Sequence, residues 1–205
     1  MKNSLKNLKS WELKLKELTE KISCLKEGDI LVLSGSIPAT LSSKIYKELS
    51  ENIKKNVKIV LDTRGNLLQD NIHNNFFIKP NIHELRDMFN EKLETKEEIV
   101  KKCSFFLERG VENVIISRGG DGALLVNNEF VMEASVPKGE LINSIGAGDS
   151  MVAGFIAGYV GNMSLENSFR LAVAAGRATA YSYGLAEKDF VDKLYKEIKI
   201  IKEGV

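Results

Sequence analysis

The sequence is poor in several residue types that often define a specialised fold or site. Its 205 residues include two cysteines, two histidines, three prolines and one tryptophan. Cys24 and Cys103 are too few and too far apart for a disulfide framework, so we expect reduced thiols. His73 and His83 have no partner at zinc-ligand spacing and are expected at the surface. These shortages exclude a disulfide scaffold and a histidine-based zinc site.

An excess of one charge and long apolar runs are also absent. The 29 basic and 28 acidic residues leave a formal net charge of +1, which gives no basic footprint for nucleic acid. No apolar run is long enough to span a bilayer, and the N-terminus lacks the apolar core of a signal peptide. The mixed Glu and Lys face of the N-terminal segment favours solvent over a membrane surface. We expect a cytoplasmic protein with no nucleic-acid or membrane partner.

What the sequence does contain is an alternation of buried strands with amphipathic helices. Residues 29–33 and 57–61 are continuous apolar runs, and Leu41, Ile45, Leu49 and Ile53 mark a helix between them. This spacing predicts a parallel crossover unit in an α/β fold. Further strands are expected at 76–78, 113–117 and 123–126, and further helices at 1–26, 95–109, 164–182 and 187–202. A length of 205 residues, with 43% hydrophobic content, suits a single domain over residues 1–205.

The most informative stretch begins with Gly146, Ala147 and Gly148, which lead into a helix of small and apolar residues. The first amides of a helix are unpaired, and without bulky side chains they can approach a phosphate closely. Asp149 follows at once, where its carboxylate would repel a phosphate unless it acts on the group that the phosphate meets. In phosphoryl transfer such an acid can accept the proton of the attacking hydroxyl. The alternative is that Asp149 only caps the helix and the glycines only form the turn.

A polar loop directly follows the first predicted strand. It contains Ser34, Gly35 and Ser36. Ligands of parallel sheets collect at the carboxyl ends of the strands, so these hydroxyls could contact a sugar or its phosphate. The loop could equally be a turn that caps the next helix.

Asn81 and Glu84 follow a short strand and lie three residues apart, so they share one face of a helix start. An amide oxygen and a carboxylate acting through water suit Mg²⁺, which rarely sheds its hydration shell. The alternative is a helix start whose Asn and Glu are favoured by the helix dipole.

A glycine-rich corner joins the strands expected at 113–117 and 123–126. It is not a dinucleotide fingerprint, because the glycine spacing differs and a strand rather than a helix follows. The corner is therefore either a hairpin turn or a contact to a nucleotide. Its candidate residues are Ser117, Gly119, Gly120, Asp121 and Gly122.

The run Gly146-Ala147-Gly148-Asp149-Ser150 and its small-residue helix resemble a signature of the PfkB/ribokinase family of sugar kinases, and the upstream motifs occur in the family's order. The resemblance implies a ribokinase-like three-layer α/β/α fold with a mostly parallel central sheet. It implies that Asp149 is the catalytic base and that the amides of 146–148 form the anion hole. It further implies ATP near the 117–122 corner, Asn81 and Gly148, Mg²⁺ near Asn81 and Glu84, and a sugar phosphate near residues 34–36 and Asp149.

Within the family, the motifs are most similar to kinases that phosphorylate fructose 1-phosphate at O6 to give fructose 1,6-bisphosphate. Kinases of tagatose 6-phosphate and fructose 6-phosphate share most of these motifs. The resemblance also implies that roughly a hundred N-terminal residues of a typical family member, including several strands and a β-lid, have no counterpart here. We therefore expect the C-terminal catalytic and nucleotide-binding part of such a kinase, with an unpaired sheet edge. A homodimer is expected only of the full-length enzyme, and an inactive nucleotide-binding remnant is the alternative.

Overall fold

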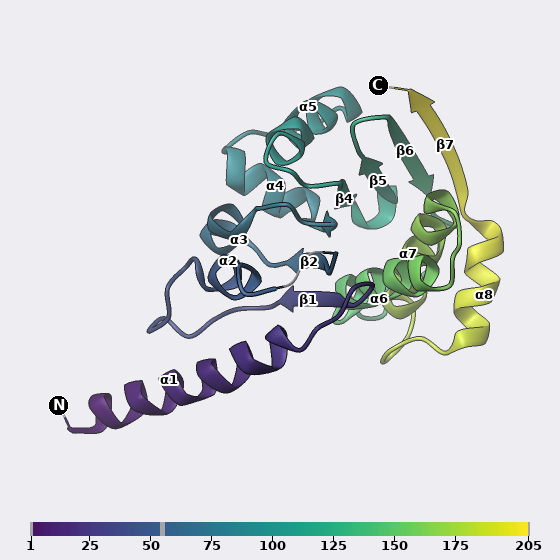
Figure 1. Ribbon diagram of the computed structural model, residues 1–205. Helices are drawn as coiled ribbons and strands as arrows, with labels where there is room; N and C mark the ends of the chain where they lie inside the picture. Colours follow the sequence, from purple (N-terminus) through teal and green to yellow (C-terminus); the bar gives the residue numbers. More distant parts are fainter. Residues whose placement is uncertain (1, 54–55, 205) are drawn as a thin grey trace.

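The computed structural model describes residues 2–53 and 56–204, and of residues 2–12 only the backbone (Figure 1). Helices and strands alternate along most of the chain, as the sequence predicts. The strands are β1 (Ile30–Ser34), β2 (Lys58–Asp62), β3 (Phe77–Ile78), β4 (Asn113–Ser117), β5 (Ala123–Val126), β6 (Phe130–Ser135) and β7 (Lys199–Gly204). The helices are α1 (Lys2–Ser23), α2 (Ile45–Ser50), α3 (Gly65–Asn71), α4 (Ile82–Phe89), α5 (Lys96–Leu107), α6 (Ala147–Val160), α7 (Leu165–Ala180) and α8 (Lys188–Glu197), with a 3₁₀ turn at Gly119–Asp121.

The seven strands form one mixed sheet in the order β1-β2-β3-β4-β5-β6-β7. The pairs from β1 to β4 are parallel, and the pairs from β4 to β7 are antiparallel. The sheet predicted as mostly parallel is therefore parallel in one half only. Because β1 to β4 run in the same direction, their carboxyl ends meet at one edge of the sheet, which is where ligands usually bind.

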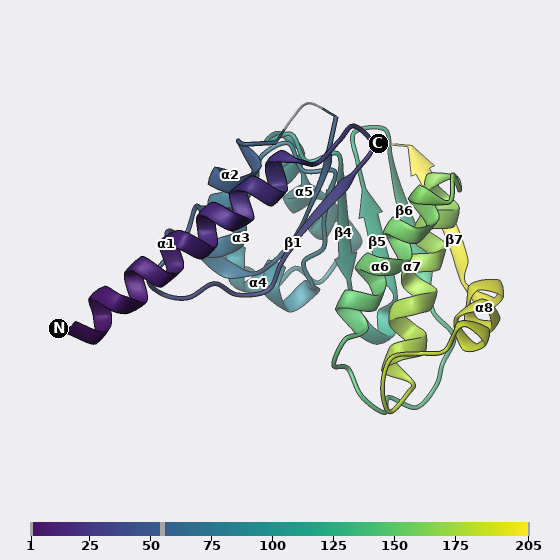
Figure 2. The same ribbon diagram turned by 60° about the horizontal axis from the view of Figure 1, so that its bottom comes forward.

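Successive side chains of the strands point to opposite faces, and each face has its own hydrophobic core. Leu61, Ile78 and Ile116 pack with α1–α5 on one face. Val60, Phe77 and Ile115 pack with α6–α8 on the other. Figure 2 shows the two groups of helices on either side of the sheet, which gives the expected three layers.

Helix α2 is much shorter than the sequence predicts. The helix expected from Leu41 to Ile53 is confined to Ile45–Ser50. The Ser42 hydroxyl accepts a hydrogen bond from the amide of Lys44 at 3.1 Å, which offers this backbone an alternative to helix.

The last helix was expected to continue to about residue 202, and this was wrong. Helix α8 ends at Glu197, Ile198 is extended, and Lys199–Gly204 forms β7. This segment pairs with all six residues of β6, and the Lys202 ammonium lies 3.8 Å from the centre of the Phe130 ring. Tertiary pairing thus overrides a local composition that favours helix.

Two further expectations concern the cysteines and the membrane. Cys24 is exposed and Cys103 is buried, and both are free thiols. Burial raises the pKa of the Cys103 thiol to about 12, so it remains protonated.

Within the described residues, no helix combines the length and the apolar character that a membrane crossing requires.

Candidate active site

The carboxyl ends of β1 to β4 bring most of the predicted site residues to one edge of the sheet. Ser34 and Asp62 are register partners at the ends of β1 and β2. Leu61 pairs with Ile78, so Lys79 follows one step beyond and lies beside Asp62. Asn81 in turn forms a parallel bridge with Ser117 at the end of β4.

Helix α6 begins at this same edge. Gly146 occupies its N-cap position with φ of 79°, in the left-handed region that favours glycine. A Cβ added to Gly148 would lie 3.2 Å from the Lys79 ammonium nitrogen, so the start of the helix is packed directly against this lysine. The Ala147 amide donates to the Ser144 carbonyl at 3.2 Å. The first turn of α6 and a buried cation therefore lie side by side.

Asp149 is exposed in the first turn of α6. No side chain caps this helix, so the capping role considered for Asp149 is not what the structure shows. Its negative charge is the smallest of the causes that act on the pKa of the Asp62 carboxyl, which it raises. Asp149 is thus accessible to a ligand at the glycine-lined helix start.

The Lys79–Asp62 ion pair was not predicted from the sequence. The Lys79 nitrogen lies 3.2 Å from an Asp62 carboxylate oxygen, and the two side chains are only 7% and 16% exposed. Burial raises the pKa of the Asp62 carboxyl; Lys79 opposes this shift and Asp149 adds to it. The signal available in the sequence was a charged residue at the end of each of two apolar runs, Asp62 after 57–61 and Lys79 after 76–78.

Asn81 and Glu84 form a capping box at the start of α4. The Asn81 amide oxygen accepts from the backbone N–H of Glu84 at 2.9 Å, and the Glu84 carboxylate accepts from the backbone N–H of Asn81 at 2.9 Å. The helix-start alternative is therefore present. The hydrogen bond to Asn81 occupies one carboxylate oxygen of Glu84, and the other oxygen can bind water or a ligand.

This donor set fits Mg²⁺ only as a hydrated ion. Among the described residues, no group of three or more His, Cys, Asp or Glu side chains could hold a metal directly. Glu84 and Asn81 are half-buried near the sheet edge, and Mg²⁺ commonly combines one or two carboxylates with water and substrate phosphates. The residues present are compatible with that arrangement.

The loop after β1 is fixed through its backbone. The Ser34 carbonyl accepts from the Tyr46 hydroxyl at 2.8 Å, and the Gly35 carbonyl accepts from the Thr63 hydroxyl at 2.9 Å. Gly35 has φ of 85°, which favours glycine there. Ser34, Gly35 and Ser36 are exposed, and Ser34 is the register partner of Asp62.

In the corner between β4 and β5, Gly122 has a structural reason to be glycine. Its φ is 82°, and an added Cβ would lie 1.9 Å from the Ala134 carbonyl oxygen of β6. Ser117 is half-exposed, and Gly119, Gly120 and Asp121 are exposed at the edge that also holds Asn81. The interpretation of this corner as a turn thus explains Gly122. Gly119, Gly120 and Asp121 remain accessible to a ligand.

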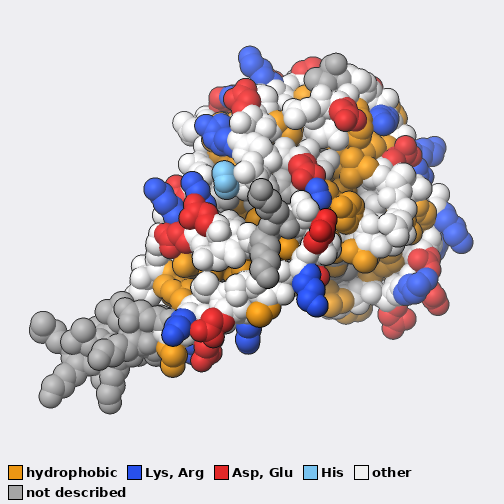
Figure 3. Space-filling model, in the orientation of Figure 1, with side chains coloured by type: hydrophobic (Ala, Val, Ile, Leu, Met, Phe, Trp, Pro, Cys, Tyr) orange, Lys and Arg blue, Asp and Glu red, His pale blue; other side chains and the backbone are white. Residues whose placement is uncertain are grey.

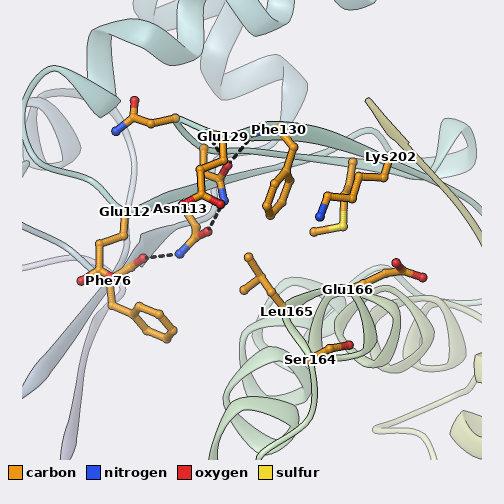
Figure 4. A pocket seen from close by; sticks show the side chains of 12 residues that line it. Phe76, Glu112, Asn113, Glu129, Phe130, Ser164, Leu165, Glu166 and Lys202 are labelled. Atoms are coloured by element: carbon orange, nitrogen blue, oxygen red, sulfur yellow. Dashed lines mark hydrogen bonds between the residues drawn. The ribbon is translucent and has the colours of Figure 1, made fainter. Parts of the chain in front are cut away.

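Two cavities of about 650 and 570 Å³ lie at the opposite end of the sheet. The larger is lined by Phe76, Phe130 and Leu165, with Glu112 and Lys202 among its polar residues (Figure 4). It lies where β6 and α7 begin. Figure 3 shows hydrophobic side chains at the surface of the molecule between charged ones. Neither cavity contains a predicted site residue, so cavity size alone would have indicated a different location.

Comparison with known proteins identifies the family. Residues 6–190 match the pfkB family carbohydrate kinases. The chain belongs to this family. Among curated PfkB relatives, it is 46% identical over 189 residues to a 1-phosphofructokinase from Bacillus subtilis, covering 91% of this chain and 62% of the relative. It is 36% identical over 192 residues to a D-tagatose-1-phosphate kinase from Bacillus licheniformis, covering 92% of this chain and 63% of the relative.

Solved PfkB structures confirm the ribokinase-like fold. The phosphofructokinase-2 from Escherichia coli, in complex with substrates and products, matches with a TM-score of 0.81 and 29% identity, covering 89% of this chain and 61% of that one. A ribokinase from Arabidopsis thaliana, complexed with ribose and ATP, matches with a TM-score of 0.69 and 25% identity, covering 89% of this chain and 58% of that one. The chain spans less than two thirds of the length of these relatives.

Proposed function

We propose that the chain forms the C-terminal catalytic and nucleotide-binding part of a hexose-phosphate kinase, as one domain over residues 1–205. The reaction is the transfer of a phosphoryl group from ATP to O6 of fructose 1-phosphate, giving fructose 1,6-bisphosphate and ADP. The observation that carries this proposal is an exposed Asp149 beside a glycine-lined helix start that packs on Lys79. The 46% identity to a 1-phosphofructokinase supports the choice of substrate.

Each group at this edge has a role in such a transfer. Asp149 accepts the proton of the sugar hydroxyl as the hydroxyl oxygen attacks the phosphorus. The amides of 146–148 stabilise the charge on the transferring phosphoryl oxygens, aided by the positive end of the α6 dipole. The exposed loops at 34–36 and 117–121 lie at the same sheet edge, where they would contact the sugar phosphate and the nucleotide.

Mg²⁺ would be held through water by Glu84 and Asn81. When bound, it neutralises charge on the nucleotide phosphates.

Two alternative functions are set beside this proposal: a different sugar-phosphate substrate, and nucleotide binding without turnover. The 36% identity to a D-tagatose-1-phosphate kinase favours testing tagatose phosphates as substrates beside fructose 6-phosphate. The second alternative is a nucleotide-binding remnant without turnover. The chain spans 62% of the length of the first relative.

A coupled assay of ADP formation with fructose 1-phosphate tests the proposal. We expect Asp149→Asn to lower kcat by about 10²- to 10⁴-fold, which is the usual contribution of a general base. Asp192→Asn, at a half-exposed position of α8 where the carboxylate pairs with Lys188, is the matched control and should retain the wild-type rate. Equal rates for wild type and Asp149→Asn would rule out the catalytic assignment. ATP binding by calorimetry without turnover would support the remnant.

A further inference from the structure

Four charged side chains connect the corner after β4 with the C-terminal strand. They are Arg118 in the corner, Glu133 on β6, Lys96 at the start of α5 and Glu203 on β7. One Glu133 oxygen lies 2.6 Å from an Arg118 nitrogen, and the other lies 3.6 Å from the Lys96 ammonium. Lys96 also pairs with Glu203 at 2.8 Å. Because each oxygen of Glu133 faces a cation, the orientation of this carboxylate is fixed.

Glu133 carries its negative charge at neutral pH. Burial raises the pKa of its carboxyl, but the hydrogen bond and charge of Arg118, together with Lys96, outweigh burial and hold the pKa below its ordinary value of 4.5. The side chains of Arg118 and Glu133 are only 15% and 30% exposed. A largely buried ion pair is often no more stabilising than apolar residues of similar size. This pair therefore calls for a role besides stability.

Arg118 connects Glu133 with the backbone of the corner. The same guanidinium nitrogen that pairs with Glu133 also donates to the Asp121 carbonyl at 2.9 Å. The Arg118 backbone closes the turn as well, since its amide donates to the Gly122 carbonyl at 2.8 Å and its carbonyl accepts from the Asp121 amide at 3.1 Å. The Asp121 carbonyl is thus the point at which the charged network reaches the exposed residues 119–121.

Strand β6 contacts the corner at two successive residues. A Cβ added to Gly122 would lie 1.9 Å from the Ala134 carbonyl oxygen, and Glu133, one residue earlier, holds Arg118. The first contact is backbone packing and needs no charge, whereas the second fixes one carbonyl of an exposed loop that contains two glycines. Glycine loses more conformational freedom on ordering than any other residue, so a loop that is ordered in advance binds a ligand at a lower entropic cost.

We propose that Glu133 is a positioning residue for the nucleotide, which acts through Arg118 to fix the Asp121 carbonyl and the loop 119–121 before ATP binds. This inference rests on the proposed kinase function, which assigns the nucleotide to this corner. Glu133 compensates the charge of Arg118, so the guanidinium shapes the corner and is not a phosphate ligand.

The variant that tests this inference replaces the ion pair by an apolar pair, Arg118→Met combined with Glu133→Leu. Such a replacement is often neutral or stabilising, so urea denaturation should give a free energy of unfolding at least equal to that of wild type. Calorimetric titration with ATP and Mg²⁺ should show binding that is weaker by about 3- to 10-fold, the usual size of one hydrogen bond, because the Asp121 carbonyl has lost its donor. A purely structural role predicts unchanged ATP affinity in every variant that folds.

Single variants test the same inference if the double variant does not fold. Glu133→Gln retains a side-chain oxygen that can accept from Arg118, whereas Glu133→Leu retains none. We therefore expect Glu133→Gln to bind ATP more tightly than Glu133→Leu. The matched control is Lys58→Met combined with Glu112→Leu, which replaces a 2.7 Å ion pair at the opposite end of β4 from the corner. Its ATP affinity should equal that of wild type.

The outcomes separate this inference from the function on which it rests. A wild-type chain that binds no ATP overturns both. Wild-type ATP affinity in the double variant, or equal affinities of Glu133→Gln and Glu133→Leu, overturns the role of Glu133 alone. Tighter ATP binding by Glu133→Leu also overturns it, since Glu133 would then be withholding Arg118 from the phosphates.

Discussion

Asp62 is the carboxyl whose titration best reports the electrostatics of the site. Burial raises its pKa above the ordinary value of 3.8, so the folded chain holds this proton more tightly than the unfolded chain. The resulting stability is fully present below the unfolded pKa and is lost as pH rises through the folded pKa. The free energy of unfolding of wild type, minus that of Asp62→Asn, should therefore decrease as pH rises from below 3.8. Urea unfolding at a series of pH values measures it, and a difference that increases with pH would contradict the assignment.

At the residue scale, the sequence was a good guide to local geometry and a poor guide to pairing. The helix start at Gly146 and the turn at Gly122 could be predicted, because glycines in such places have local causes. The Asp62–Lys79 pair could not, since it depends on the register of two strands that residues 63–76 separate in the chain. The roles of Asp149, Ser34 and Ser36 remain predictions.

Helix α6 depends on its close packing with α7. A Cβ added to Gly154 would lie 2.8 Å from the Leu171 carbonyl oxygen and 2.9 Å from the Ala172 Cα, both backbone atoms that cannot simply rotate away. Alanine favours helix by about 1 kcal/mol over glycine, but overpacking typically costs about 1–3 kcal/mol. We expect Gly154→Ala to lower the free energy of unfolding, against its helix propensity. Chemical denaturation measures this.

The exposed Ala153 gives the control for that prediction, in the same helix and one residue away. Ala153→Gly should cost about 1 kcal/mol, from propensity alone. A Gly154→Ala chain that is more stable than wild type would mean that the two helices can separate without cost.

At the scale of elements, hydrophobic periodicity predicted strands β1 to β5 and most helices, but neither the largely buried strand β6 nor helix α3. Strands β4 and β5 were predicted with their bounds, because each is a short apolar run between clear turn residues. The C-terminal strand β7 was missed, because its pairing with β6 is not encoded in its own charged composition. The order of the strands and the antiparallel half of the sheet likewise result from tertiary contacts.

On the scale of the whole molecule, the two edges of the sheet differ in character. Strand β7 carries Lys199, Lys202 and Glu203 along its length, and such charges discourage pairing with other chains. Strand β1 has the sequence Ile-Leu-Val-Leu-Ser, and among the described strands it pairs only with β2. Val32 is 41% exposed on it. This apolar edge, unpaired among the described strands, agrees with the edge expected from the sequence.

Hydrogen exchange of the chain with and without ATP and Mg²⁺ tests the central claim most directly. The account places the phosphates at the start of α6, so amides of residues 146–149 and of the 117–122 corner should exchange more slowly with nucleotide present. Amides around Phe76, Phe130 and Leu165, which line the larger cavity, should be unaffected. Protection at that cavity, with no change at residues 146–149, would contradict the account.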